Sequence, residues 1–148
     1  MWQQLFGLTN AVALVAWALL ILGPRRWVPA IRYAGVGLLC AAYVVLVVML
    51  AGGLVDPVRE PGTSGNLTGY SVRGLRALFA SDGGIVVGWT HYLAFDLFAG
   101  TWMAEEADRR GFGRLAQTPV LLLTFLAGPA GLLLWFLLSR GKGLARLR

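Results

Sequence analysis

Residues 33–55 read YAGVGLLCAAYVVLVVMLAGGLV and carry no charged side chain over 23 positions. A helix rises about 1.5 Å per residue, so this stretch is long enough to cross a hydrocarbon core about 30 Å thick. The run is unbroken and lacks the alternation of a membrane β-strand, which favours a helix. We therefore predict that residues 33–55 form a transmembrane helix.

Three further segments have the same character. Residues 5–22 and 118–139 contain no charge, and residues 83–104 contain one acid, Asp96, and one histidine, His91. Only 14% of the 148 residues are charged and the mean hydropathy is +0.68, whereas soluble domains are about a quarter charged. The sequence predicts a single all-α domain, residues 1–148, that is a polytopic integral membrane protein built as a four-transmembrane-helix bundle.

The basic residues lie at the ends of these segments and do not form a nucleic-acid-binding patch. The net charge is +6, and Arg25, Arg26 and Arg32 follow the first segment, where they can meet phospholipid headgroups. The expected location is the cytoplasmic (inner) membrane of a bacterium, with membrane lipid as a partner and no nucleic acid. Four spans place both termini on one side, and Lys and Arg counts of seven and six on the two sides do not separate the orientations.

The longest connector, Asp56–Asp82, divides into two parts. Residues 57–69 are rich in Pro, Gly, Ser, Thr and Asn, as in a loop. Residues 71–81 instead place apolar side chains on one helical face and two arginines towards the other. These residues are Val72, Leu75, Leu78 and Phe79, with Arg73 and Arg76. A short helix in the headgroup layer or over the mouth of the bundle is predicted, with a partly ordered connector as the alternative.

The fourth segment begins with Thr118-Pro119 and contains Gly128-Pro129-Ala130-Gly131 near its middle. Proline inside a helix removes one backbone hydrogen bond and clashes with the preceding turn, so we expect a kink there. Thr124 precedes Gly128 by four residues, and this pair of small residues would allow close helix contact.

No metal or cofactor site is expected. The lone cysteine, Cys40, lies within the second segment and cannot form an intrachain disulfide. The sequence has no paired cysteines, no His-x-x-His spacing and no phosphate-binding loop.

The third segment carries the candidate chemistry. A carboxylate near the bilayer centre costs about 2.5–3.5 kcal/mol on insertion scales, so Asp96 should face the bundle interior with a partner, or stay protonated. His91 can act as acid or base near neutral pH, and the two residues form a candidate catalytic acid–base pair for a lipid-soluble substrate. Five positions separate them by about 140° around the helix, so they would border opposite edges of one inward arc.

Aromatic residues around this pair are candidates for binding such a substrate. Tyr92 lies four residues before Asp96 and is its more natural hydrogen-bond partner within the helix. Asn10 in the first segment is a candidate partner from across the bundle. The substrate-binding candidates are Trp89, Tyr92, Phe95, Trp102 and Asn10. In the alternative interpretation, His91 and Asp96 only hold the helices together and the aromatic residues are packing.

Charged residues follow the third segment at three-to-five spacing. The acids are Glu105, Glu106 and Asp108, and the bases are Arg109, Arg110 and Arg114. We expect ion pairs along a solvated extension of the helix.

The run Gly88-Trp89-x-His91-Tyr92-Leu93-x-Phe95-Asp96-Leu97-Phe98 resembles the signature of the abscisic-acid-deficient-four-like membrane proteins. Further matches are Asn10 and Trp17 in the first segment, and Thr118-Pro119, Leu122, Thr124, Gly128, Pro129 and Gly131 in the last. Plant members are implicated in making neoxanthin from violaxanthin, a carotenoid epoxide. The resemblance implies isomerisation without a redox cofactor, in which His91 and Asp96 share the acid and base roles and the aromatic residues line a slot for a polyene.

One position departs from the family pattern. The family often has arginine where this chain has Thr101, which weakens the transfer of the plant activity. Three functions therefore remain open. These are an isomerase-like enzyme for a carotenoid or related isoprenoid, a non-enzymatic carotenoid- or lipid-binding or accessory membrane protein, and a small transporter or proton-linked channel that uses Asp96. Self-association as a homo-oligomer also remains open.

Overall fold

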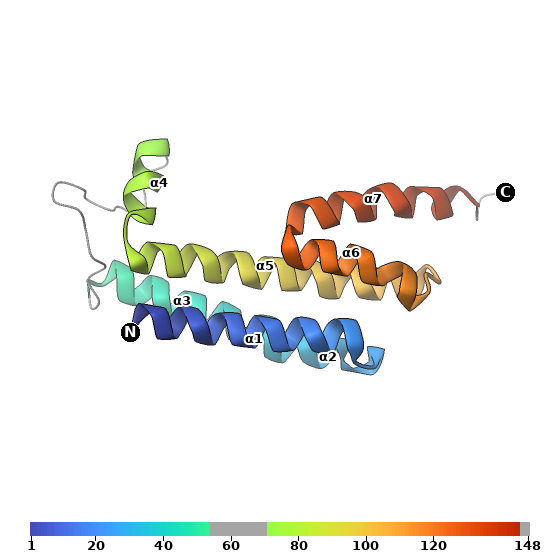
Figure 1. Cartoon of the computed structure of the whole chain (residues 1–148), viewed down its shortest axis with the longest axis horizontal. Helices are drawn as coiled ribbons and strands as arrows, with labels where there is room; N and C mark the ends of the chain where they lie inside the picture. The colour runs from blue at the N-terminus through green and yellow to red at the C-terminus, as the bar shows by residue number, and fades with distance from the viewer. Residues whose placement is uncertain (54–70, 146–148) are drawn as a thin grey trace.

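The computed structural model describes residues 1–53 and 71–145, and every regular element in these residues is a helix (Figure 1). The all-α prediction is therefore confirmed for this part of the chain. The predicted connector, residues 57–69, and the last two residues of the second predicted span, 54 and 55, lie outside the described residues.

The first helix, α1 (Trp2–Leu22), ends at the same residue as the first predicted span, and Gly23-Pro24 follow it. The chain becomes helical again at Arg25, eight residues before the second predicted span begins at Tyr33. Pro29 lies at the beginning of the α-helical part of this second run, a position that suits the fixed φ of proline. The run consists of η1 (Arg25–Trp27), α2 (Val28–Ala30), the π-helical η2 (Ile31–Val36) and α3 (Gly37–Ala51).

Two helical stretches are long and apolar enough to cross a membrane. They are Trp2–Leu22, with a mean hydropathy of 2.2, and Arg25–Ala51, with a mean hydropathy of 2.5. Among the described residues, no other helix meets both conditions. The first two predicted spans are thus helices of the expected character, whereas the predicted bundle of four spans is not reproduced.

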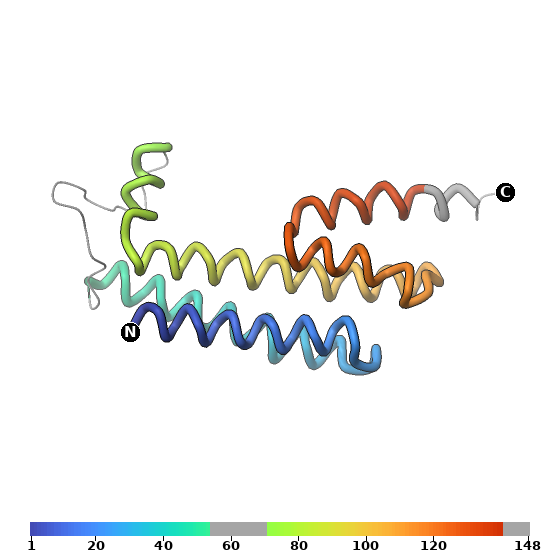
Figure 2. Tube along the Cα trace, viewed as in Figure 1, coloured from blue at the N-terminus to red at the C-terminus, as the bar shows by residue number. Residues whose placement is uncertain are grey.

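The long helix α5 (Asp82–Arg109) packs against both of these stretches, parallel to α1 and antiparallel to α3 (Figure 2). Gly100 allows a close approach to α1, because the ring of Trp17 lies directly on it. A Cβ atom at position 100 would come within 2.8 Å of the Trp17 ring atom Cζ3. Both Trp17 and Leu97 are almost completely buried in the core between the helices.

The predicted helix in the central connector is present as α4 (Val72–Phe79). Ser71 caps it by accepting a hydrogen bond from the Gly74 N–H at 3.0 Å. Phe79 packs on Gly88 of α5, where a Cβ atom would lie 2.9 Å from the Phe79 Cζ atom. This contact docks α4 onto the beginning of α5, while Val72 and Leu75 remain exposed.

The prediction of one kinked helix over residues 118–139 is wrong. The chain forms two helices, α6 (Arg114–Leu126) and α7 (Gly128–Ala145), which fold back on each other as an antiparallel hairpin (Figure 1). Pro129 cannot donate a backbone hydrogen bond to α6, and a proline suits the first turn of a new helix. Ala127 between the two helices adopts φ −155° and ψ 75°, which ends α6.

The hairpin reverses the direction of the chain half-way along α5. The described chain therefore begins at one end of α5 and leaves α7 at the other (Figure 1). Thr124 and Gly131 face each other across the hairpin, and a Cβ atom at position 131 would lie 2.5 Å from the Thr124 backbone nitrogen. The small residues of this segment thus serve a contact between α6 and α7.

Gly100→Ala should destabilise the protein by about 1–3 kcal/mol, because the added methyl group overlaps the Trp17 ring in a close-packed contact. The measurement is the free energy of unfolding in mixed detergent micelles. Gly37→Ala is the matched control, since a Cβ atom at that helical position meets nothing within 4 Å. Equal stabilities of the two variants would contradict the packing described here.

Candidate functional site

Asp96 lies where the α6–α7 hairpin turns. Its carboxylate touches Gly128, the first residue of α7, so closely that a Cβ atom on Gly128 would overlap it. The Asp96 Oδ2 atom is buried and has no hydrogen-bond partner among the described residues. A helix N-terminus carries unpaired N–H groups and a partial positive charge, so the carboxylate is well placed to stabilise the beginning of α7.

Tyr92 is the side chain that accompanies Asp96. It lies one turn earlier on α5, with its hydroxyl in position to donate to the Asp96 carboxylate and to accept from the Gly128 backbone N–H. The structure therefore places Tyr92 beside Asp96, one turn earlier on α5, as their spacing predicts. The pair ties α5 to the first residue of α7.

A partly enclosed cavity of about 430 Å³ lies beside Tyr92, between α1, α5 and the end of α6. Its polar atoms come from few side chains. Asn10 accepts a hydrogen bond from the Trp89 indole N–H at 3.1 Å, and its amide donates to the Phe6 carbonyl at 2.6 Å. Asn10 thus orients Trp89 and does not reach Asp96. The lining residues are Asn10, Ala13, Leu14, Trp89, Tyr92, Leu93, Phe125 and Leu126.

His91 lies on a different face of α5. Its ring packs against Tyr43 of α3, with ring centroids 5.4 Å apart, and against Phe95 at 4.7 Å. Asp96 faces the hairpin of α6 and α7 instead. The structure therefore does not bring His91 and Asp96 together, and the single inward arc expected for them is not formed.

The predicted substrate-binding residues also divide into two groups. Asn10, Trp89 and Tyr92 converge on the cavity, where the Trp89 and Tyr92 rings stack with centroids 5.5 Å apart. Phe95 is 60% exposed beside His91, and Trp102 packs against Phe136 of α7 at 6.3 Å. These last two side chains do not line the cavity.

The family model described as ABA DEFICIENT 4-like matches residues 4–135. The chain belongs to the ABA4-like family. The match covers α1, α5 and the α6–α7 turn, so it includes the cavity and the Tyr92–Asp96 pair of this ABA4-like protein. No curated protein and no solved structure shows significant similarity to the chain.

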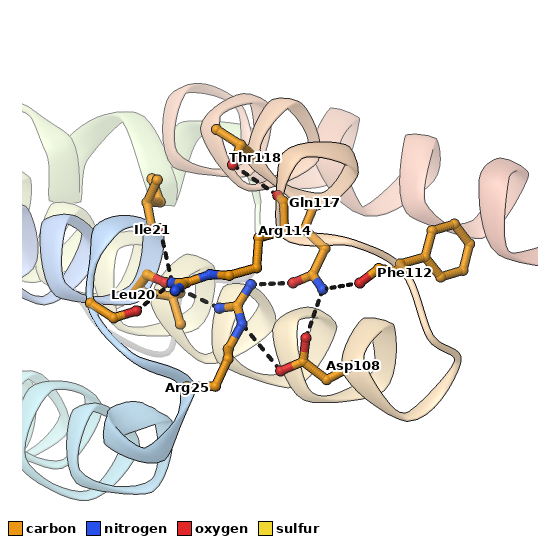
Figure 3. A network of polar contacts seen from close by, with 9 residues as sticks. Leu20, Ile21, Arg25, Asp108, Phe112, Arg114, Gln117 and Thr118 are labelled. Atoms are coloured by element: carbon orange, nitrogen blue, oxygen red, sulfur yellow. Dashed lines mark hydrogen bonds and ion pairs between the residues drawn. The ribbon is translucent and has the colours of Figure 1, made fainter.

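A network of charged and polar side chains lies where α1 and α5 end and α6 begins in the ABA4-like fold (Figure 3). Arg25 pairs with Asp108 at 3.1 Å and donates to the side chain of the buried Gln117. The Gln117 amide donates to Asp108 at 2.7 Å. Arg114 donates to the Gly23 carbonyl at the end of α1. This network joins the end of α1 to α5 and the beginning of α6.

The expected ion pairs along α5 are thus only part of the arrangement. Glu106 pairs with Arg109 at 2.9 Å and with Arg110 at 2.6 Å within the helix, as predicted. Asp108 and Glu105 instead reach other helices, Glu105 through a 2.8 Å ion pair with Arg32. The importance of Gln117 was missed, because a lone amide in an apolar segment gives little sign of its partner.

Arg32 also bears on the departure at Thr101. Its Nε atom donates to the Thr101 hydroxyl at 3.3 Å, and its guanidinium lies 6.0 Å from the centre of the Phe98 ring. A guanidinium therefore occupies the neighbourhood of position 101, although it comes from η2 and not from α5. The same guanidinium also pairs with Glu105, an acid near the end of α5.

Gly128→Ala should lower the free energy of unfolding by about 1–3 kcal/mol, because the new methyl group overlaps the Asp96 carboxylate. The loss should shrink in an Asp96→Ala background, where the overlapping atoms are absent. A double-mutant cycle in mixed micelles measures this coupling. Gly113→Ala, a position where a Cβ atom meets nothing within 4 Å, is the control. Additive effects of Gly128→Ala and Asp96→Ala would contradict the contact.

Proposed function

We propose that this ABA4-like protein is an integral membrane protein that binds a carotenoid or related isoprenoid and isomerises it by acid–base chemistry. The observation that carries the proposal is the cavity beside Asn10, Trp89 and Tyr92, with Asp96 next to Tyr92 at the hairpin turn. The family's link to neoxanthin synthesis supplies the substrate class.

The outer surface of the helices supports membrane embedding. Only 28% of the most apolar window in each of the two spanning-length stretches is buried within the protein. Large aliphatic side chains such as Leu14, Val15, Val44 and Val45 are 55–60% exposed. A continuous apolar surface of this kind is rare on soluble monomers and suits contact with acyl chains. In the proposed arrangement α5 crosses the membrane as well.

The α6–α7 hairpin would then enter the membrane and return to the same side. Its turn contains backbone that makes no regular helix, which is tolerated at membrane depth only where protein covers it. Gly128, Gly131 and Thr124 are buried in the hairpin, and Asp96 covers its turn. Two short helices joined in this way place the beginning of α7 beside the middle of α5.

This topology also changes the distribution of basic residues. At the end of the molecule where α5 and α7 finish, the described arginines are Arg25, Arg26, Arg32, Arg109, Arg110, Arg114 and Arg140. At the other end they are Arg73 and Arg76. Cytoplasmic segments carry the excess of Lys and Arg, so we infer that α7 ends in the cytoplasm and the N-terminus lies outside it. If the chain instead formed four spans, its Lys and Arg residues would divide almost evenly between the two sides of the membrane.

Single cysteines placed in a Cys40→Ser background should report this topology. A membrane-impermeant maleimide should label Ala80→Cys in intact spheroplasts, whereas Gly113→Cys and Arg140→Cys should react only after lysis. All three positions are exposed in the structure. Four spans would place residues 113 and 140 on opposite sides, so different labelling of these two cysteines would overturn the proposal of a re-entrant hairpin.

The chemistry requires two proton movements and no change in oxidation state. When an epoxide is converted to an allenic alcohol, a carbon–oxygen bond breaks, a proton reaches the oxygen, and another leaves carbon. Tyr92 lines the cavity and lies beside Asp96, so the two side chains could share a proton. We assign Tyr92 to give a proton to the substrate oxygen as the carbon–oxygen bond breaks. Asp96 accepts the proton that leaves carbon as the new carbon–carbon double bond forms, and returns it to Tyr92. His91 faces α3 and is not assigned to this step.

Two alternatives use the same residues. A non-enzymatic carotenoid- or lipid-binding or accessory protein needs only the cavity. A small transporter or proton-linked channel is favoured by a separate observation, since discontinuous helices beside an acidic residue are typical of transporter sites. The first alternative predicts bound pigment without turnover, and the second predicts proton flux in liposomes that depends on Asp96.

The test uses full-length protein expressed in cells that supply a carotenoid epoxide and purified in mild detergent. Copurifying pigment, measured by absorption and mass spectrometry, should fall about tenfold in Trp89→Ala, which corresponds to about 1.4 kcal/mol of lost binding. Asp96→Asn should retain pigment and lower its isomerisation about 100-fold, the lower range for general acid–base catalysis.

Asp82→Asn is the matched control, because Asp82 is an exposed acid at the beginning of the same helix. His91→Ala separates the two pairings of Asp96. Joint action of His91 and Asp96 requires turnover to be lost, whereas the pairing with Tyr92 requires it to persist. Full turnover in Asp96→Asn would reject acid–base catalysis at this site.

A further inference from the structure

A second concave surface lies on the opposite side of α1 from the cavity. It is a groove of about 640 Å³ between α1 and the run from η1 to α3, and it shares no lining residue with the cavity beside Tyr92. Apart from the indole of Trp27, every residue in its lining is aliphatic or glycine. The lining residues are Ala11, Val12, Val15, Ala16, Leu19, Trp27, Ala30, Ile31, Ala34, Gly35 and Leu38.

Small side chains form the groove. Gly35 approaches α1 so closely that a Cβ atom there would lie 3.1 Å from the Ala16 Cβ atom, which makes the floor. On both sides of this contact, Ala11, Ala30 and Ala34 leave space that longer side chains would fill. Because the groove lies on the two stretches most suited to cross a membrane, its open side would face acyl chains.

The length and direction of the groove fit one leaflet. Along α1 it extends from Ala11 to Leu19, about 12 Å at 1.5 Å per residue, compared with about 15 Å for half of the hydrocarbon core. It ends at Trp27, whose ring packs on Gly23 at the basic end of the molecule. Tryptophan is typical of the membrane interface, so this end of the groove lies at headgroup depth.

A cation is available at this end. Arg25 and Arg32 are engaged by Asp108 and Glu105, and Arg114 by backbone carbonyls. Arg26 directly precedes Trp27 and is exposed, with no ion pair or hydrogen bond to any described residue. A headgroup phosphate could form an ion pair with Arg26, since anionic headgroups attract basic residues at the membrane surface.

From this groove and its cation, we propose that the groove binds one anionic phospholipid of the cytoplasmic leaflet, with an acyl chain along Ala11–Leu19 and the headgroup at Arg26. The proposal rests on the membrane embedding proposed above and does not depend on catalysis. The lipid would fill the space between the first two helical stretches and join them without a polar contact.

The experiment measures lipid retained by the full-length protein in native mass spectrometry after incubation with equal amounts of phosphatidylglycerol and phosphatidylcholine. Wild type should retain one phosphatidylglycerol in preference. Arg26→Gln should lower this preference about fivefold, the factor expected for one basic residue at the headgroups. Arg73→Gln removes an exposed charge at the other end and should change nothing.

Ala34→Phe fills the groove and should abolish retention of this one lipid, whereas Ala41→Phe adds the same bulk to an exposed position of α3 outside the groove. Ala11→Phe, on the opposite wall, serves the same purpose if Ala34→Phe unfolds. Unchanged retention in both groove variants, or equal retention of the two lipids by wild type, would overturn the proposal. A wild-type dimer that Ala34→Phe alone dissociates would also overturn it, by identifying the occupant as a second copy.

Two further measurements separate failure of this proposal from failure of the proposed function. Wild-type protein that alkaline carbonate extracts from membranes would reject membrane embedding itself. Pigment retained by Ala34→Phe at the wild-type level would show that the cavity beside Tyr92 is intact, so that any loss of lipid is due to the groove.

Discussion

The contact between Asp96 and the first residue of α7 is the interaction on which the arrangement of this ABA4-like protein depends. Pro129 forbids a continuous helix through residues 118–139, but a proline alone would permit a kink. The reversal needs a surface against which the new helix can begin. Asp96 and Tyr92 supply that surface from α5, and Gly128 allows them to approach because it has no side chain.

The same contact gives the acid a structural role alongside any chemical one. A carboxylate in an apolar environment needs a compensating partner, and a helix N-terminus provides one without a second charged side chain. The cavity is lined by Tyr92, which lies beside Asp96, so a ligand in the cavity would affect the contact between Asp96 and α7. In the proposed function, Tyr92 and Asp96 of α5 would therefore couple ligand binding in the cavity to the packing of the hairpin.

Much of the fold could be predicted from the sequence. The apolar runs identify α1 and α3, the pattern of residues 71–81 identifies α4, and the spacing of Tyr92 and Asp96 identifies their pairing. The hairpin could not be predicted, because apolar composition is the same for a kinked span and for two helices that fold back. Whether α7 begins anew depends on the contact with Asp96, which is distant in sequence.

The site was predicted less completely for a geometric reason. His91 and Asp96 are separated by about 140° around α5, so two different neighbours can face them. The neighbouring helices determine which side chains they meet. His91 packs against Tyr43, and Asp96 contacts Gly128. Asn10, Trp89 and Tyr92 converge as expected because they lie on the faces of α1 and α5 that meet.

The position of the hairpin turn has a consequence for biosynthesis. If the last two helices enter and leave by one face, the basic residues at the end of α7 never need to be translocated. Their transfer would have opposed both the insertion energetics of charged groups and the membrane potential. The translocation machinery would have to export only the first residues and the segment around α4. Because α7 begins anew at Gly128-Pro129, the nascent chain avoids the translocation of these basic residues.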